Sequence, residues 1–391
     1  MSEDDDLDLN ADKCQGLVDK FVEITATDSA CAQFYLQDRK WNLERSVSDY
    51  FEANASSRAS TSTDLGISNV GEKLLNVLGP DYQLTTVPPP TFTFASWNLD
   101  GLQIRNLKMR TKAVCKILFE EKIDIVFLQE LIPETIAYIK DRLPEYQVIS
   151  GRMGQEDYFS ATLLLCFTVH YESHKVIPHP TSRMTRNLLC VKACIGDTKL
   201  ALINSHLEST KEHMAERVKQ FRSGLKCLTT TSPQRTGIFA GDFNLRDKEV
   251  DMAGGLPSGV EDIWEACGSR PEVRYTWDTK RNGNAQQLIA GAGYKGFWPR
   301  MRFDRAYIKY SLMRDVVPQH FGLVGLQKIS GTQSFPSDHW GIRVWFDNRR
   351  SQASSSDTTV DSKDQCSEVS AGPCKKKARV KVEEIDFDAV D

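Results

Sequence analysis

The segment that most constrains the fold of this chain is 236–247, with the sequence TGIFAGDFNLRD. Its short apolar beginning predicts a buried strand, and Gly241 permits a tight turn at the end of that strand. Asp242 and Asn244 then lie together, where one group can deprotonate a water and the other can donate to a phosphate oxygen. An Asx turn that merely closes a strand has the same pattern, so the rest of the chain must decide between these interpretations.

Residues capable of chemistry also stand at the ends or starts of five other predicted strands. They are Asn98 in WNLDG, Glu130 in LQE, His206 in NSHLES, Asp304 in FDR, and Asp338 with His339 in SDHWG. Each has a plain explanation when it is taken alone, such as a turn cap, a solvated acid or a structural histidine. Strands alternate with helices throughout this part of the chain, which predicts two packed sheets flanked by helices.

The pattern of composition divides the chain into five parts. We predict an acidic disordered segment at 1–16, a helical domain at 17–53, a linker at 54–90, a large domain at 91–347 and a disordered tail at 348–391. Within the large domain, the sequence predicts a strand at Thr162–Thr168 and a helix at Val260–Cys267.

Charge and hydropathy limit the partners of the chain. The formal net charge is -4, so a nucleic-acid site has to be a local patch rather than a property of the whole surface. No apolar run approaches the roughly 20 residues of a membrane span, and the amino terminus lacks the features of a signal peptide. We therefore expect no membrane binding. The sequence leaves the oligomeric state open, and a monomer is the default expectation.

Two short motifs lie in the tail. Lys375–Arg379 is either a nuclear-import cluster or a solvated basic run, and the first interpretation predicts a nuclear protein that is also found in the cytoplasm. Lys381 lies in VKVE, which fits the apolar-Lys-x-Glu pattern of a SUMO acceptor.

The helical domain at 17–53 resembles a UBA-like domain. Its apolar residues fall on the faces of three short helices, and the segment Trp41–Glu44 precedes the third. The resemblance implies binding of ubiquitin, and a docking module for another partner is the alternative.

The ordered set of six motifs resembles the endonuclease/exonuclease/phosphatase superfamily of Mg²⁺-dependent phosphodiesterases and phosphatases. The resemblance implies an α/β fold, a four-layer αββα sandwich, over the large domain. It also implies that Glu130 binds Mg²⁺, with Mn²⁺ as a substitute, and that Asp338 lies beside the metal. A carboxylate at a strand end suits such a hard cation.

The same resemblance implies roles for the other motif residues. It implies that Asp242 is the general base and that Asn98 and Asn244 position the phosphate and the water. It also implies that His206 and His339 stabilise the transition state and that Asp304 orients His339. Fixed donors around one cation are what an in-line displacement at phosphorus requires.

Within the superfamily, the motifs WNLDG, SHLEST, GDFNLRD and TWDT look like those of 5′-tyrosyl-DNA phosphodiesterases. These enzymes cut the bond between a DNA 5′-phosphate and the tyrosine of trapped topoisomerase II, so the implied partner is DNA with a 5′-linked tyrosine or topoisomerase II peptide. Arg246 and Trp277 then look like a phosphate clamp and a base platform. The remaining implied substrate contacts are Ser209, Arg186 and Tyr158.

Two alternatives remain. One is a related Mg²⁺ phosphodiesterase, such as an abasic-site nuclease or an RNA 5′-tyrosyl unlinkase, since DNA and RNA present the same ester. The other is a ubiquitin-binding signalling adaptor with a degenerate phosphodiesterase domain. The sequence argues against the adaptor because none of the six motifs has lost its reactive residue.

Overall fold

The structure is a computed structural model with two compact units. It describes residues 11–50, except 26, 28, 39–40, 44 and 48–49, and residues 88–350, except 155 and 291–297. The predictions for most of the linker and for the tail, including Lys375–Arg379 and Lys381, lie outside these residues.

The amino-terminal unit contains helices α1 (Ala11–Thr25) and α2 (Ser29–Asp38). Its core includes Phe21, whose ring stacks on Tyr35 with centroids 5.9 Å apart. The prediction of disorder up to residue 16 is wrong from Ala11 onward, where α1 begins. The first turns are strengthened by Gln15, which donates to Asp19 one turn later at 2.8 Å.

The large unit is built on two mixed six-stranded sheets, in which strands that are neighbours in space are often distant in the sequence. In spatial order, the first contains β13 (Val316–Val324), β14 (Gly341–Asn348), β1 (Thr91–Asn98), β2 (Ile125–Leu131), β4 (Phe159–Leu165) and β3 (Tyr146–Ser150). The second contains β5 (His170–Pro178), β6 (Asn187–Ile195), β7 (Thr198–His206), β8 (Thr236–Asp242), β12 (Asp304–Lys309) and β9 (Val260–Asp262). Each sheet has one parallel pair at its centre, β1 with β2 and β7 with β8.

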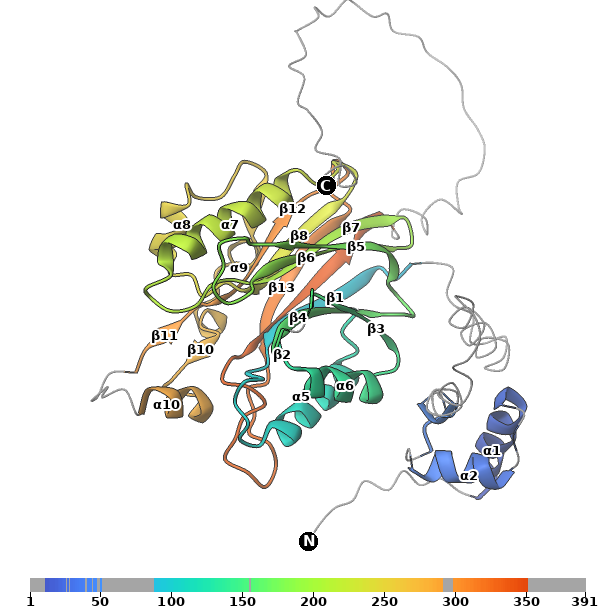
Figure 1. Cartoon of the computed structure of the whole chain (residues 1–391). Coiled ribbons are helices and arrows are strands. Elements are labelled where there is room, and N and C mark those ends of the chain that lie inside the picture. The colour runs from blue at the N-terminus through green and yellow to red at the C-terminus, as the bar shows by residue number, and fades with distance from the viewer. Residues whose placement is uncertain are drawn as a thin grey trace, which may run out of the picture. The chain divides into compact units, whose positions relative to one another are not determined.

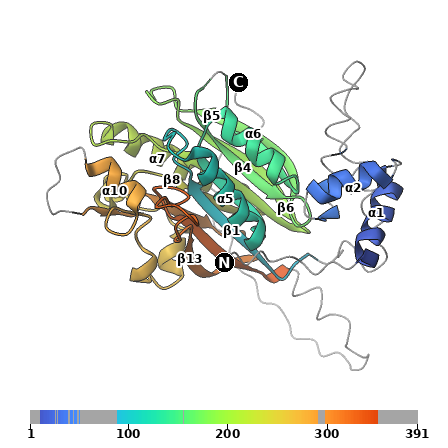
Figure 2. The same ribbon diagram turned by 90° about the horizontal axis from the view of Figure 1, so that it is seen from below.

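Four helices cover the outer faces of the two sheets. They are α5 (Leu107–Glu121), α6 (Pro133–Arg142), α7 (Met214–Thr229) and α8 (Asp247–Met252). Two short helices lie elsewhere: α9 (Ile263–Ala266) contacts β12 and β13, one strand of each sheet, and α10 (Gly283–Ala290) contacts β10 (Trp277–Asp278). In Figure 1, α5 and α6 lie on the face of the first sheet that points away from the second sheet, and α7 and α8 lie on the opposite, outward side of the second sheet. Figure 2 shows α5 and α6 lying across their sheet. This arrangement confirms the predicted four-layer αββα sandwich.

Apolar residues fill the space between the sheets. Phe94 of β1 packs edge-to-face on Phe127 of β2, with ring centroids 4.9 Å apart, and both side chains are fully buried. A second core lies under α7, where Phe221 contacts the rings of Phe239 and Tyr307. Each buried aromatic side chain contributes about 2–3 kcal/mol to the burial term, so these two cores hold the strand ends in fixed positions.

Two predicted elements differ from the structure. Strand β4 ends at Leu165, earlier than the predicted Thr168, because Leu165 O accepts from Thr168 N and Val169 N in a turn. The helix predicted at Val260–Cys267 is a short strand, β9, followed by α9. The side chain of Asp262 accepts from Trp264 N and caps the helix at this later position.

Two small elements complete the description of this unit. They are a 3-10 helix (Pro271–Val273) and a two-stranded sheet of β10 (Trp277–Asp278) and β11 (Arg300–Met301). None of the helices among the described residues combines the length and apolar character needed to cross a bilayer.

Gly241 is required by the close approach of β8 to β7. Its φ is 149°, and a Cβ at this position would lie 1.8 Å from Ser205 O. Because backbone cannot move away as a flexible side chain can, we expect Gly241→Ala to lower the free energy of unfolding by about 3 kcal/mol. The measurement is a urea unfolding curve.

The matched control is Gly283→Ala, where the nearest atom to the added Cβ lies 3.8 Å away. This variant should change the free energy of unfolding by less than about 1 kcal/mol. Equal effects of the two substitutions would show that the contact with Ser205 does not fix the strand end.

Candidate active site

The residues at the carboxyl ends of the parallel strands converge on one point between the two sheets. Asp242 ends β8, where it pairs in register with His206 of β7 on one side and Asp304 of β12 on the other. Asn98 ends β1 in register with Gln129 of β2. The two parallel pairs, together with the antiparallel pairing of β12 with β8, therefore bring together residues that are far apart in the sequence.

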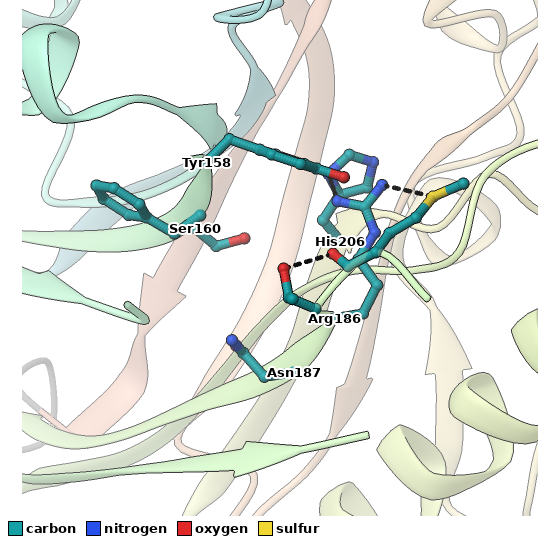
Figure 3. Close-up of a pocket in the computed structure, with 8 residues that line it drawn as sticks. Tyr158, Ser160, Arg186, Asn187 and His206 are labelled. Carbon is teal, nitrogen blue, oxygen red and sulfur yellow. Dashed lines mark hydrogen bonds between the residues drawn. The ribbon is translucent and has the colours of Figure 1, made fainter. Parts of the chain in front are cut away.

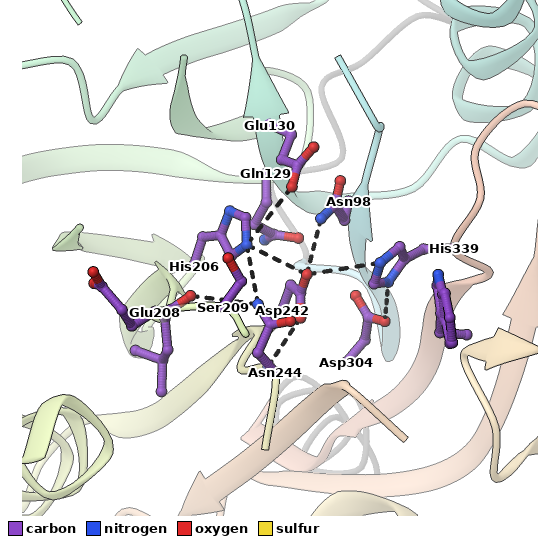
Figure 4. A network of polar contacts seen from close by, with 12 residues as sticks. Asn98, Gln129, Glu130, His206, Glu208, Ser209, Asp242, Asn244, Asp304 and His339 are labelled. Atoms are coloured by element: carbon purple, nitrogen blue, oxygen red, sulfur yellow. Dashed lines mark hydrogen bonds and ion pairs between the residues drawn. The ribbon is translucent and has the colours of Figure 1, made fainter. Parts of the chain in front are cut away.

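Asp242 lies at the centre of the resulting network, between His206 and His339 (Figure 4). Its carboxylate is 1% exposed, and its Oδ2 accepts a 2.8 Å hydrogen bond from Asn98 Nδ2. Its Oδ1 accepts from Asn244 N at 3.0 Å. Burial raises the pKa of Asp242, and the positive charge of His339 opposes this shift. The carboxylate is thus a stronger base than an exposed aspartate.

The acidic neighbours of His339 favour its protonated form. Its Nδ1 donates to Asp304 Oδ2 at 2.7 Å. Burial by itself lowers the pKa of His339, but the carboxylates of Asp304, Asp338 and Asp242 outweigh burial and raise the pKa well above its ordinary value. The free Nε2–H lies 3.8 Å from Asp242 Oδ2, so a charged donor faces the centre of the site.

His206 has the opposite charge state. Its Nδ1 lies 2.8 Å from Nη1 of Arg186, and a guanidinium can only donate, so Nδ1 is the acceptor and Nε2 carries the proton. Burial and the charges of Arg186 and His339 lower the pKa of His206 well below its ordinary value. The Nε2 of this neutral ring lies 3.4 Å from Asp242 Oδ2 and 3.2 Å from the side-chain amide nitrogen of Asn244.

Arg186 and Tyr158 lie together beyond His206 (Figure 3). The Arg186 guanidinium lies 5.0 Å from the centroid of the Tyr158 ring, and both line a pocket with Met184, Asn187 and His206. Arg186 is only 5% exposed. The structure therefore brings both predicted substrate contacts to the site, with Arg186 positioned chiefly against a histidine.

The carboxyl groups next to the network fit a hard divalent cation. Burial raises the pKa of Glu130, and the nearby carboxylate of Asp338 raises it further. Asp100, which the sequence did not single out, has a pKa raised to about 8 by burial and by Asp338, against the opposing charge of Arg110. Mg²⁺, Mn²⁺ and Ca²⁺ prefer oxygen ligands, and a cation bound among these carboxylates would also relieve their mutual repulsion.

A second geometric possibility for a cation is the group Asp242, Asp304 and His339, whose ligand atoms lie within 4.8 Å of one another. In this group the proton of His339 already occupies the space between its ring and Asp304. A cation there would have to replace a charge-assisted hydrogen bond, so the carboxyl cluster around Glu130 fits better.

The backbone is strained at three of the strand ends. The φ angles of Asp100, Glu130 and Asn244 are 50°, 55° and 52°. These values lie in the left-handed region of the backbone, which residues other than Gly adopt uncommonly. Gly101 is also tightly placed, because a Cβ there would lie 2.0 Å from Glu130 O. The functional side chains are therefore held on turns that the fold imposes.

Arg246 and Trp277 both lie next to Phe303. The Arg246 guanidinium is 6.0 Å from the centroid of the Phe303 ring, and the centroid of Trp277 is 5.8 Å from it. Trp277 Nε1 also donates to Asp338 Oδ2 at 3.0 Å, which connects this aromatic surface to the acidic cluster. Ser209 instead donates to the sulfur of Met184 at 3.1 Å.

Sequence reasoning missed four residues of this site. They are Asp100, Gln129, Phe303 and Glu208, all of which lie inside motifs that it did quote. Gln129 donates to Asn204 Oδ1 across the two sheets at 2.8 Å. Glu208 accepts from Ser182 Oγ and Arg183 N, at 2.8 and 2.9 Å. The signal in the sequence that could have identified them was that each lies in the same motif as a predicted site residue.

Comparisons with known proteins agree with this geometry. Residues 95–339 match the model of the Endonuclease/Exonuclease/phosphatase family, and residues 12–57 match that of a UBA-like domain. Tyrosyl-DNA phosphodiesterase 2 (TDP2) of Mus musculus is 38% identical over 82% of this chain and 86% of its own. The Homo sapiens protein of that name is 35% identical over 83% of this chain and 90% of its own. The chain belongs to the tyrosyl-DNA phosphodiesterase 2 family.

Solved structures of this family have the same fold. A structure named Danio rerio TDP2 complexed with single-strand DNA product matches 66% of this chain and all of its own, with a TM-score of 0.62 and 38% identity. TDP2 from C. elegans matches 85% of this chain and 93% of its own, with a TM-score of 0.59 and 33% identity. The resemblance drawn from the motifs is confirmed at the level of the family, while the roles of single residues stay predictions.

The charge state of His339 depends on its acidic neighbours. Because the Asp304 carboxylate raises the pKa of His339, Asp304→Asn should lower that pKa toward its ordinary value. An NMR titration of the His339 ring, in EDTA and without substrate, measures the shift.

Asp197→Asn provides the control for this titration, because Asp197 is an exposed carboxylate on the hairpin between β6 and β7. It should leave the pKa of His339 unchanged. An unchanged pKa in Asp304→Asn as well would contradict the charged state of His339.

Proposed function

We propose that the chain is a DNA repair enzyme that hydrolyses the 5′-phosphotyrosyl bond between DNA and the peptide of trapped topoisomerase II. The products are a tyrosine and a ligatable DNA 5′-phosphate. The observation that carries the proposal is the set of donors around the buried Asp242 carboxylate. Family membership supports it, since the family is named for tyrosyl-DNA phosphodiesterase activity.

The cation in this proposal is Mg²⁺, with Mn²⁺ as a substitute. Glu130 would hold it, and Asp338 and Asp100 would complete the acidic surroundings. When bound, a divalent cation neutralises negative charge on the phosphoryl oxygens of the substrate. Its charge would also lower the pKa values of these carboxyl groups, which burial and mutual repulsion otherwise raise.

Asp242 is the proposed general base. Burial raises its pKa, which makes the carboxylate a stronger acceptor of a proton from water, and the charge of His339 limits the rise and so keeps the deprotonated form accessible. Asn98 Nδ2 and the backbone N–H of Asn244 fix both carboxylate oxygens. The base therefore needs no reorganisation before it deprotonates an aligned water.

The two histidines are the proposed stabilisers of the pentacovalent transition state. The charged His339 and the neutral His206 both direct an Nε2–H toward the same centre from opposite sides of Asp242. Donors fixed before the reaction stabilise the charge that develops on the phosphoryl oxygens. The tyrosine phenol has an ordinary pKa of ~10, so it leaves with less help from an acid than a sugar hydroxyl needs.

Trp277 and Arg246 are the proposed contacts of the DNA strand. An aromatic face supports a base of any sequence, and a guanidinium that is 36% exposed can pair with a phosphate. Tyr158 and Ser209 line the other side of the centre, next to Met184.

Several further expectations accompany this function. The match of residues 12–57 to a UBA-like domain supports ubiquitin binding through 17–53. Nuclear localisation, with some protein in the cytoplasm, SUMO attachment at Lys381 and a monomeric state remain predictions from the sequence.

The test is single-turnover cleavage of a 5′-phosphotyrosyl DNA oligonucleotide with Mg²⁺. We expect release of a 5′-phosphate, loss of activity in EDTA, and a fall of at least about 10³-fold in Asp242→Ala, which lacks the base. The controls are an abasic-site duplex, a 3′-tyrosyl oligonucleotide and a 5′-tyrosyl RNA.

Cleavage of the abasic duplex in place of the tyrosyl substrate would replace the proposal with an abasic-site nuclease. A strong preference for the RNA would favour the RNA unlinkase. A signalling adaptor would be favoured if cellular function survives both Glu130→Ala and Asp242→Ala.

Trp277→Ala tests the contact with the terminal base. Stacking contributes about 1–3 kcal/mol per base, so KM for the oligonucleotide should rise about tenfold. Steady-state kinetics at several substrate concentrations give KM and kcat separately. Trp345→Ala, which removes an indole from β14 away from the site, is the control and should leave KM unchanged.

A further inference from the structure

Arg217 is a fully buried charge that the chemistry of the site does not use. It lies on α7, is 0% exposed, and directs its guanidinium toward the loop that follows β7. Its Nη1 donates to Glu208 O and Thr210 O, at 3.0 and 2.7 Å. One side chain thus binds two carbonyls of the loop that follows His206.

The other edge of the same guanidinium binds Glu249 of α8. Nε and Nη2 of Arg217 donate to the two carboxylate oxygens, at 3.0 and 2.7 Å, in a two-point ion pair. Glu249 is itself 4% exposed, and its Oε2 also accepts from the backbone N–H of Arg246 at 3.1 Å. The Glu249 carboxylate therefore caps α8 and fixes the residue just before it.

The loop after β7 is held to α7 at a second point. The side chain of Gln220 donates to Glu208 Oε2 at 3.0 Å and accepts from Glu208 N at 2.8 Å. Glu208 in turn holds Ser182 and Arg183, at the start of the segment that leads to Arg186. One face of α7 thereby ties down the loops on which Ser209, Arg246 and Arg186 are mounted.

A buried ion pair is a weak means of stabilising a fold, because removing two charges from water offsets most of their attraction. The pair of Arg217 and Glu249 instead fixes the orientation of the two side chains, because a planar guanidinium can donate to both oxygens of a carboxylate in only one geometry. The other partners of this guanidinium are not core residues but backbone carbonyls of a loop at the active site.

We propose that Arg217 is a positioning residue that acts through Glu249 to set the place of Arg246 relative to the DNA phosphate. This inference rests on the proposed function, because it concerns the substrate contact of Arg246. The Arg246 side chain is 36% exposed, and its Nη1 lies 3.5 Å from Glu249 Oε1. Arg217 itself is too deeply buried to touch substrate.

Arg217→Lys is the informative variant. A lysine keeps the positive charge, but a single ammonium cannot bind a carboxylate at two points and two carbonyls at once. We expect kcat/KM for the 5′-tyrosyl oligonucleotide to fall about tenfold, mostly through a higher KM. Arg222→Gln is the matched control on α7, because Arg222 is exposed and binds only Met252 O and Ala253 O at the far end of α8.

A double-mutant cycle separates positioning of Arg246 from a general loss of structure. In an Arg246→Ala background, Arg217→Lys should lower kcat/KM by less than about twofold, because the residue that it positions is already gone. The same tenfold loss in both backgrounds would overturn the proposal. If Arg217→Lys fails to fold, as a urea unfolding curve would reveal, Glu249→Gln takes its place in the cycle.

A binding measurement keeps this test independent of the proposed activity. Fluorescence anisotropy with a 5′-phosphorylated oligonucleotide in EDTA reports the Arg246 contact without catalysis. Arg217→Lys should weaken binding of this oligonucleotide when Arg246 is present and should have no further effect in the Arg246→Ala background. If the wild type binds this probe with the expected coupling but cleaves no tyrosyl substrate, the proposed function fails while the positioning role of Arg217 stands.

Discussion

A 2.8 Å hydrogen bond between Asn98 and Asp242 joins the two sheets at the ends of their parallel strands. The Asp242 carboxylate is almost completely buried, and a buried charge is tolerated only when donors surround it. These donors come from both sheets and from the turn that follows β8. The requirement to satisfy one carboxylate thus fixes how the sheets meet, and with it the distances between the residues of the site.

The two sheets of the large unit support the site with the same arrangement of strands and helix. In each, a parallel pair of strands is connected through a helix, α5 between β1 and β2 and α7 between β7 and β8. Each helix also sends a buried arginine to the carbonyls of the loop after the first strand. Arg110 donates to Leu99 O and Asp100 O, as Arg217 does to Glu208 O and Thr210 O. Rigid helices therefore support both sides of the site.

The order of the six motifs made much of the site predictable from the sequence. Their resemblance to a known superfamily implied that Asn98, Glu130, His206 and Asp242 belong to one site, and the structure places them at or near the carboxyl ends of the parallel strands of the two sheets. The contact of Arg186 with His206 could not be predicted, since it depends on a long loop whose path is set by hydrogen bonds to Glu208. Element ends were also missed where a side-chain cap or a turn, rather than periodicity, decided them.

The positive φ angles of Glu130 and Asn244 have a consequence for the evolution of this chain. Asparagine is tolerated in the left-handed region, but glutamate is not favoured there, and glycine would relieve the strain at either position. The most stabilising replacement is therefore one that removes the functional side chain. Selection for stability and selection for activity therefore oppose each other at these positions.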